Sequence, residues 1–184
     1  MNVPTNKCLI VGDISVGKTS LTSRLITGVS PDPTDTIPDV HEVHSVESKI
    51  GERVVALLLT DTGSSPDSQK LYEHAAVVFI CFAINDVTSF DHVKSQWLDV
   101  VRSHTKSDVP IFLVGCKSDL RAEEGHIVVE NRTARALATE IGAINYIETS
   151  SYTGKGTKEL IDEATQASFP KKVSKPLRYK CILQ

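Results

Sequence analysis

The sequence predicts a doubly wound α/β domain, in which helices cover both faces of a mostly parallel β-sheet. Short apolar runs of strand length alternate along the chain with longer segments whose apolar residues recur at helical spacing. The runs are almost continuously apolar, as expected of parallel strands that are covered on both faces. Ligands of such folds bind at the carboxyl ends of the strands, so functional residues are expected in the loops there.

The expected strands are separated by segments long enough for helices. Parallel strands are expected over residues 7–11, 53–60, 76–84, 110–115 and 144–149. Residues 40–48 alternate weakly between apolar and polar side chains, which favours an edge strand. We expect this edge strand to pair with residues 53–60 after a turn near Gly51.

Four of the expected helices cover residues 20–26, 67–74, 130–141 and 158–168. Ser65 and Pro66 offer an N-cap and a first helical residue to the second of these helices. A fifth helix is expected to be capped by residues 88–91, because the apolar residues that follow share one face. These apolar residues are Phe90, Val93, Trp97, Val100 and Val101.

The composition is that of one globular domain. The chain has 184 residues, of which 40% are hydrophobic and 23% are charged. No apolar run is long enough to span a bilayer. The four cysteines form no CxxC pair, so we expect reduced thiols in a cytosolic protein.

The net charge of −3 conceals an acidic body and a basic tail. Residues 171–184 carry five basic residues and no acidic one, which leaves 15 basic against 23 acidic residues, a net charge of −8, in residues 1–170. A nucleic-acid-binding protein presents a basic face on its folded part. The acidic body therefore argues against nucleic acid as a partner, and the tail is expected to act separately.

The most specific motif, GDISVGKT, runs from Gly12 to Thr19 and fits the phosphate-loop pattern G-x-x-x-x-G-K-[ST] at every fixed position. It lies between a predicted strand and a predicted helix, as this motif requires. Its glycines let successive backbone N–H groups point at one phosphate chain, and the helix N-terminus adds a positive dipole end. Lys18 is expected to reach the outer phosphates, and the Thr19 hydroxyl is expected to hold Mg²⁺.

Two acidic residues that follow strands extend this prediction. Asp61 follows the apolar run 54–59, where phosphate-loop proteins place an acid that holds Mg²⁺. Asp119 follows the strand at 110–115 in the sequence Lys117-Ser118-Asp119. Its carboxylate can accept from both N–H groups on one edge of guanine, whereas adenine presents no such pair of donors. The sequence therefore predicts binding of a guanine nucleotide.

In these motifs the chain resembles the Ras superfamily of small GTPases, and most closely its Rho branch. The Rho-like stretches are residues 79–84, 96–98, 109–115, 141–143 and 146–150. The helical insert of Rho proteins is largely absent, because residues 121–129 are too short for it. The resemblance implies a GTPase domain over residues 1–169 that binds GTP or GDP with Mg²⁺ and signals to effector and regulatory proteins through residues 31–40 and 63–74.

The resemblance also implies which residues contact the nucleotide. They are Gly12, Asp13, Ile14, Ser15, Val16, Gly17, Lys18, Thr19 and Ser20 in the phosphate loop, Cys116, Lys117, Asp119 and Leu120 in the guanine loop, and Ser150, Ser151 and Tyr152 in the last loop. Thr19 and Asp61 are implied for Mg²⁺. The family threonine that closes over Mg²⁺ is not at its usual position; Thr34 or Thr36 could replace it, and so could Asp39, which would also repel phosphate oxygens.

Two substitutions fall where the family hydrolyses GTP. Ile14 stands at the usual glycine, and its branched side chain would crowd the attacking water and an incoming arginine finger. Ser65 stands at the usual catalytic glutamine and is too short to orient the water, and Ser64 replaces the glycine before it. Orienting the water and adding an arginine finger are together worth about 10⁵ in rate. Slow hydrolysis or none is expected, and no residue is identified as catalytic.

Other substitutions affect the base. Cys116 replaces the asparagine that braces the guanine site, Tyr152 replaces a lysine, and no aromatic residue lies in residues 27–40 to cover the base. A thiol can still make a weak hydrogen bond. We expect nucleotide binding to survive with reduced affinity.

The last four residues, from Cys181 to Gln184, form a C-a-a-X box that predicts prenylation of Cys181, and the terminal glutamine favours farnesyl. One prenyl chain anchors weakly, and each basic residue of the tail adds about 1 kcal/mol near an anionic leaflet. We expect residues 170–184 to tether a monomer to the cytoplasmic face of the plasma membrane or an endomembrane, with a cytosolic pool.

Three functions remain open. The chain could be a membrane-tethered switch that holds GTP and hydrolyses it slowly, a pseudo-GTPase that serves as an interaction module, or a normally cycling GTPase with unusual switch residues. The intact Lys18, Thr19, Lys117 and Asp119 favour the first function.

Overall fold

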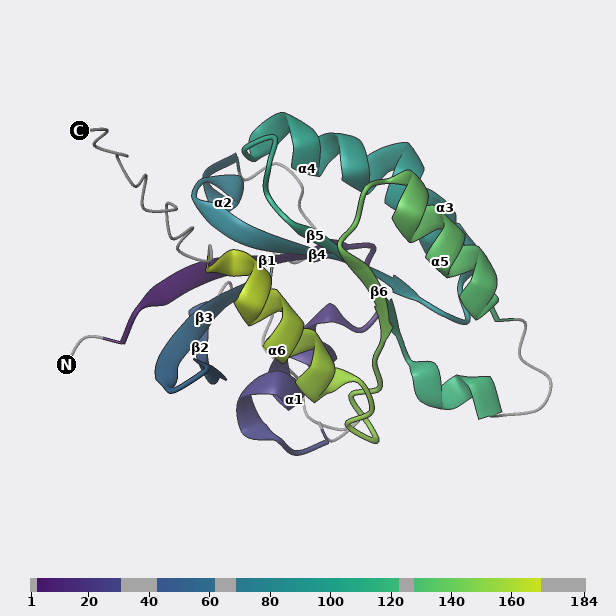
Figure 1. Cartoon of the computed structure of the whole chain (residues 1–184). Coiled ribbons are helices and arrows are strands. Elements are labelled where there is room, and N and C mark those ends of the chain that lie inside the picture. Colours follow the sequence, from purple (N-terminus) through teal and green to yellow (C-terminus); the bar gives the residue numbers. More distant parts are fainter. Residues whose placement is uncertain (1–2, 31–42, 62–68, 123–127, 170–184) are drawn as a thin grey trace, which may run out of the picture.

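The computed structural model describes residues 3–30, 43–61, 69–122 and 128–169 (Figure 1). In these residues a six-stranded sheet has the order β2-β3-β1-β4-β5-β6, and only β2 is antiparallel to its neighbour. The predicted doubly wound sheet is therefore confirmed. Its strands are β1 (Thr5–Gly12), β2 (Val43–Ile50), β3 (Arg53–Asp61), β4 (Ala75–Ala83), β5 (Ile111–Cys116) and β6 (Asn145–Glu148).

The predicted edge strand and its turn are also present. The register of β2 and β3 pairs Ile50 with Arg53, so Gly51 lies in the tight turn between them. Gly51 has φ 61°, a left-handed conformation that a residue without a Cβ adopts at little cost.

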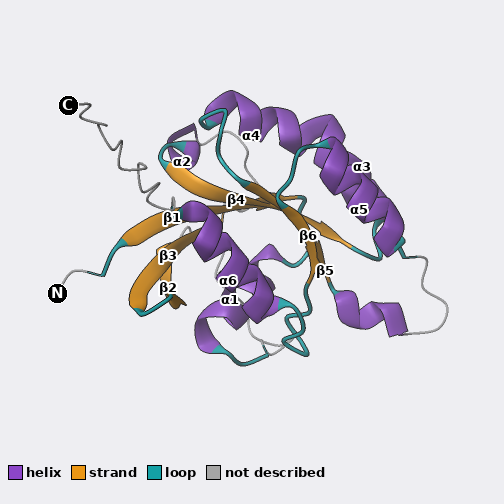
Figure 2. Ribbon diagram, viewed as in Figure 1, coloured by secondary structure: helices purple, strands orange, loops and turns teal. Residues whose placement is uncertain are grey.

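Helices cover both faces of the sheet (Figure 2). α1 (Lys18–Thr27) and α6 (Thr157–Ser168) lie on one face, and the remaining α-helices lie on the other. Those on the second face are α2 (Gln69–Tyr72), α3 (Val87–His92), α4 (Leu98–His104) and α5 (Asn131–Glu140). A π-helical turn, η1 (Val93–Trp97), joins α3 to α4, and a 3₁₀ helix, η2 (Ser118–Ala122), follows β5.

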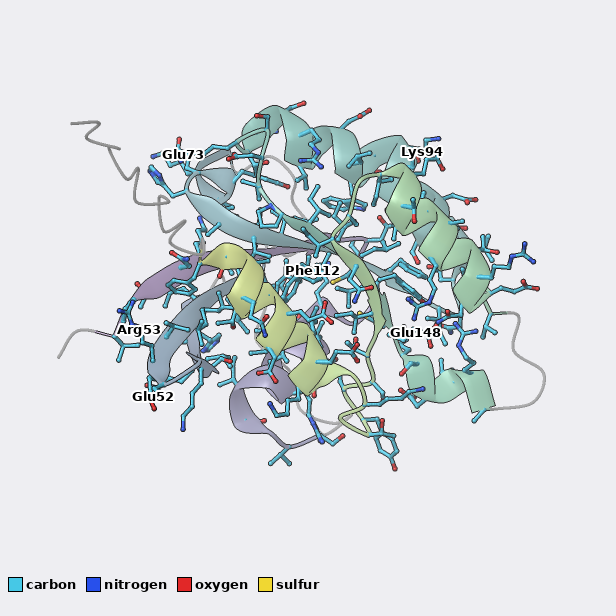
Figure 3. The ribbon with its side chains drawn as sticks, in the orientation of Figure 1. Glu52, Arg53, Glu73, Lys94, Phe112 and Glu148 are labelled. Carbon is cyan, nitrogen blue, oxygen red and sulfur yellow. The ribbon has the colours of Figure 1, made fainter. Side chains whose placement is uncertain are left out.

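The core has one apolar layer on each face of the sheet, because side chains alternate along a strand. In β1, Leu9 and Val11 pack with Trp97 and the helices of one face, whereas Cys8 and Ile10 pack with α1 and α6. Figure 3 shows Phe112 in the interior of the molecule and Glu52, Glu73 and Lys94 at its surface.

The N-cap of α3 differs from the prediction. The N-cap is Asp86, whose side chain accepts from the backbone N–H groups of Thr88 at 3.0 Å and Ser89 at 3.2 Å. Ser89 instead donates its hydroxyl to the Asp86 carbonyl at 2.8 Å and accepts from the Ala83 N–H at 3.1 Å. The cap therefore lies before residues 88–91, because an aspartate in extended conformation satisfies the free N–H groups of the first turn.

The helix expected over 67–74 is described only from Gln69 to Tyr72 as α2, and its N-cap at Ser65 lies outside the described residues. Cys8, Cys81 and Cys116 are buried free thiols, as predicted. None of the helices that the structure describes is long and apolar enough to cross a bilayer.

Candidate nucleotide-binding site

The predicted phosphate loop connects the end of β1 to the start of α1. Gly12, Ser15 and Gly17 have positive φ angles of 145°, 61° and 108°, which turn the chain sharply before the helix. A Cβ atom on Gly12 would lie 2.2 Å from the carbonyl oxygen of Cys81 on the neighbouring strand β4. Only glycine fits there, so the loop and the end of β4 are in close contact.

Lys18 extends back across this loop and is almost completely buried. Its ammonium group donates to the carbonyl oxygens of Gly12 at 2.9 Å and Asp13 at 2.8 Å. The loop therefore holds a positive charge at its centre, next to the free N–H groups at the start of α1. Such an arrangement fits a bound phosphate chain.

Thr19 and Asp61 come together from α1 and β3, as the magnesium prediction requires. The Thr19 hydroxyl donates to a carboxylate oxygen of Asp61 at 2.8 Å. A hydroxyl and a carboxylate are hard oxygen ligands, and Mg²⁺ is usually held by one or two such groups together with phosphates and water. The residues present therefore fit Mg²⁺ beside a phosphate chain.

The predicted guanine loop follows β5 and lies against the phosphate loop. Lys117 has φ 61°, and its Cε lies 3.9 Å from the position that a Cβ on Gly17 would take. Asp119 lies in η2 and accepts a hydrogen bond from the hydroxyl of Ser150, in the loop after β6. The Ser150 hydroxyl also accepts from the Thr153 N–H at 3.0 Å. The carboxylate predicted to select guanine is therefore fixed by the last loop.

Cys116 is buried between these loops, beside a second thiol. The Thr149 hydroxyl lies 4.0 Å from its sulfur. A hydrogen bond from Cys81 lowers the pKa of the Cys116 thiol, and the nearby Lys117 and Lys18 act in the same direction, although burial opposes them. The pKa of Cys81 is raised by the same hydrogen bond and by burial. The contact with Cys81 could not be predicted from local sequence, because the two residues lie on different strands.

The other predicted contacts surround these groups. Val16 is buried in the core and can offer a ligand only its backbone. Ser20 lies in α1, Leu120 in η2, and Ser151 directly after Ser150. The structure thus brings together the three predicted loops.

The side chain of Asp13 makes contacts that the sequence did not indicate. Trp97, expected to serve only the core, is buried there and also donates its indole N–H to Asp13 at 2.6 Å. His92 Nδ1 lies 2.6 Å from the other carboxylate oxygen of Asp13. The sequence offers one weak signal, which is that His92 and Trp97, each with a ring N–H, lie five residues apart. Residues on the same face of a regular α-helix are three or four apart, so this spacing does not indicate a shared contact.

Comparison with known proteins agrees with this geometry. The model of the Ras family matches residues 7–169. The chain belongs to the Ras family of small GTPases. Among curated proteins, the GTP-binding protein RHO1 of Candida albicans is 35% identical over 96% of this chain and 94% of its own length. The Rho1 proteins of Schizosaccharomyces pombe and Saccharomyces cerevisiae are each 34% identical, over 90% and 96% of this chain and 87% and 94% of their own lengths.

Two residues that depart from the pattern of this Ras-family domain lie at the surface of the site. Ile14 is 68% exposed at the tip of the phosphate loop, and Tyr152 is 72% exposed in the last loop. Neither side chain supports the core, so both are free to contact a ligand or a partner.

The remaining predicted site residues of this Ras-family protein lie outside the described residues. They are Thr34, Thr36 and Asp39 as candidates for Mg²⁺, Ser65 at the usual glutamine position, most of the partner segments 31–40 and 63–74, and the lipidation residue Cys181.

Proposed function

We propose that this protein is a membrane-tethered molecular switch of the Rho type, which binds GTP and GDP with Mg²⁺ and hydrolyses GTP slowly or not at all. The observation that carries the proposal is the phosphate loop, in which Lys18 is held by two carbonyl groups while a branched, exposed Ile14 lies at the tip. Lys18 and Thr19 keep the groups that would bind phosphate and Mg²⁺, whereas Ile14 and Ser65 stand where the family has its hydrolytic residues.

Nucleotide binding is proposed to depend on three parts of the site. The amides of the phosphate loop and Lys18 would bind the phosphates, and Thr19 with Asp61 would hold Mg²⁺. The ion neutralises charge on the phosphates when it is bound. Asp119, oriented by the Ser150 hydroxyl, would accept hydrogen bonds from guanine.

Slow hydrolysis is proposed because Ile14 and Ser65 would both hinder the attack of water on GTP. Ile14 would occupy space that water and a partner's arginine require, and Ser65 is too short to orient that water. Orienting the water and adding an arginine finger together raise the hydrolysis rate by about 10⁵, which corresponds to roughly 7 kcal/mol of activation free energy. The active state would then be set by nucleotide exchange, synthesis or membrane localisation.

Membrane attachment and signalling complete the proposal. Prenylated Cys181 and the basic residues of the tail would hold the protein at an anionic membrane surface. Effectors would bind residues 31–40 and 63–74 when GTP orders them, as in other GTPase switches.

The first test is to purify the full-length protein gently in Mg²⁺, denature it, and identify the released nucleotide by chromatography. Retained GTP is expected. Retained GDP would show that Ile14 and Ser65 permit turnover, and would favour a normally cycling GTPase. Single-turnover hydrolysis checks the same point, since a half-time of minutes without any accessory protein would exclude a slow switch.

A pseudo-GTPase is the second candidate, and the specific observation in its favour is Cys116, a buried thiol in place of a strong hydrogen-bonding amide. An empty site after purification would support it. Replacement of Lys18 by Ala would then leave partner binding unchanged, whereas a nucleotide-dependent switch would lose it.

A further inference from the structure

The carboxylate of Asp13 is held on both oxygens by one helical turn. Trp97 Nε1 donates to Oδ1 at 2.6 Å, and His92 Nδ1 meets Oδ2 at 2.6 Å. A carboxylate accepts hydrogen bonds, so this contact assigns His92 the tautomer with its proton on Nδ1. We call Asp13, His92 and Trp97 the carboxylate clamp. Its two donors lie 79 and 84 positions after Asp13 in the sequence.

The π-helical turn explains how His92 and Trp97 reach one carboxylate. In an α-helix of 3.6 residues per turn, side chains five positions apart differ in direction by about 140°. Here the N–H of Leu98 donates to the carbonyl of Val93, an i to i+5 hydrogen bond that widens the turn. The wider turn brings residues five positions apart closer in direction than a regular α-helix does. Such π turns occur frequently at functional sites.

The clamp acts on the same residue that Lys18 contacts. The Asp13 carbonyl accepts from the Lys18 ammonium group at 2.8 Å, so the residue is fixed through its backbone on one side and its carboxylate on the other. The loop that follows contains the strained, positive φ angle of Ser15. Fixing this conformation before a ligand arrives lowers the ordering cost of binding.

Removal of His92 or Trp97 would also leave the negatively charged Asp13 side chain without a restraint. Beside the clamp lies a surface hollow of about 340 Å³, lined by the phosphate loop with Asp86 and Gln96 among its other residues. This hollow gives an unrestrained Asp13 side chain room to change its rotamer. A mobile carboxylate on the phosphate loop would repel phosphate oxygens.

We propose that the carboxylate clamp positions the phosphate loop and sets the rate at which guanine nucleotide dissociates. His92 and Trp97 are positioning residues, which act through Asp13 without touching the nucleotide. This inference rests on the proposed function, because it assigns a role in nucleotide binding.

The test measures the dissociation rate of a fluorescent GDP from the full-length protein in Mg²⁺. His92→Ala and Trp97→Phe each remove one donor to a charged acceptor, and each is expected to raise the rate about tenfold. His92→Asn, whose amide can still donate to Asp13, is expected to restore most of the wild-type rate.

Lys94→Ala is the matched control. Lys94 lies on the same π turn, but its ion pair with Glu140 is more than half exposed on both sides and does not involve Asp13. The rate is expected to be unchanged. Thermal unfolding in excess GDP checks that every variant is folded.

A second readout separates this inference from the proposed function. Hydrogen exchange of the peptide spanning residues 12–18 is measured in nucleotide-free protein. Faster exchange in His92→Ala and Trp97→Phe, but not in Lys94→Ala, supports the clamp even if the wild-type protein binds no guanine nucleotide. Wild-type exchange in both variants would overturn it. An equally large rate effect of His92→Ala in an Asp13→Ala background would also overturn it, since the effect would then not pass through Asp13.

Discussion

At the scale of single residues, Cys116 is a buried thiol at the position where the resemblance implies an asparagine. The thiol fills the buried space between the phosphate loop and Thr149. A Cβ atom added to Gly17 would lie only 3.6 Å from the Cβ of Cys116. The thiol makes weak hydrogen bonds, whereas an asparagine amide both donates and accepts strongly. The two loops are therefore packed together but joined by weak polar contacts.

Cys116→Asn is accordingly expected to strengthen GDP binding. One added hydrogen bond between the loops contributes about 1 kcal/mol, or roughly a fivefold lower Kd. Displacement of a fluorescent GDP measures the Kd. The control is Cys8→Ala, since Cys8 lies in the core at a position away from both loops. Unchanged or weaker binding in Cys116→Asn would show that the thiol already serves the site fully.

Ile14 and Ser65 belong to the same scale, because each is proposed to slow hydrolysis through its own side chain. Ile14→Gly together with Ser65→Gln is expected to raise single-turnover GTP hydrolysis by at least about tenfold over wild type. Each single variant is expected to gain less, since the other lesion remains. Val87→Gly, another exposed apolar residue, controls for loss of surface area. If the double variant hydrolysed GTP at the wild-type rate, Ile14 and Ser65 would not be the residues that limit hydrolysis.

At the scale of elements, one carboxylate joins the guanine loop to the rest of the sheet. Glu148 lies at the end of β6 and is labelled in Figure 3. Its carboxylate accepts from Arg121 of η2 at 2.6 and 3.1 Å, from Asn131 of α5 at 2.9 Å and from the Tyr146 hydroxyl at 2.9 Å. Burial alone would raise the pKa of Glu148, but these hydrogen bonds outweigh it and hold the pKa below its ordinary value. Arg121 also donates to the Val129 carbonyl at 2.9 Å.

Arg121→Ala is expected to lower the free energy of unfolding by about 2 kcal/mol, because it leaves a partly buried carboxylate without its cation. Urea unfolding at neutral pH measures the change. The control is Arg135→Ala, whose exposed side chain donates to Asn131 in its own helix and lies 5.8 Å from the centre of the Tyr146 ring, without contacting Glu148 among the contacts of the described residues. An unfolding free energy within about 0.5 kcal/mol of wild type would mean that Asn131 and Tyr146 suffice.

The lowered pKa of Glu148 fixes the sign of a pH dependence. Its contribution to stability is complete above the pKa of an unfolded glutamate, about 4.3, and is lost as the pH falls through the lower pKa of the folded state. Glu148→Gln is therefore expected to be less stable than wild type near neutral pH, and to lose less stability between about pH 5 and pH 3. Parallel stability curves for the two proteins would contradict this.

At the scale of the whole molecule, parallel pairing gathers the site at one edge of the sheet. The register pairs Ile10 with Asp61, Gly12 with Cys81, and Ala83 with Cys116. The strands that carry the phosphate loop, the predicted magnesium residue Asp61 and the predicted guanine loop therefore end side by side. The opposite end of the sheet carries none of the predicted nucleotide contacts among the described residues.

The proposed membrane attachment also belongs to the scale of the whole molecule, because it would depend on two separate signals in the tail. Cys181→Ser is expected to move the protein to the soluble fraction, and exchange of the five basic residues 171–180 for Gln is expected to weaken binding to anionic vesicles by several kcal/mol. Cell fractionation and vesicle sedimentation measure these outcomes. Cys8→Ser serves as control, and a Cys181→Ser protein that remains on membranes would refute prenylation as the anchor.

The sequence by itself determined the strands, most helices and the places of the three loops that are predicted to bind nucleotide. These depend on local patterns: continuous apolar runs, glycines where the loop turns, and acids after strands. Only the tertiary structure decided that Asp13 is held by His92 and Trp97, that the free thiols of Cys81 and Cys116 are hydrogen-bond partners, and that Glu148 joins η2, α5 and β6. These contacts join residues distant in sequence, and their geometry depends on strand register and on one π turn, which no local pattern specifies.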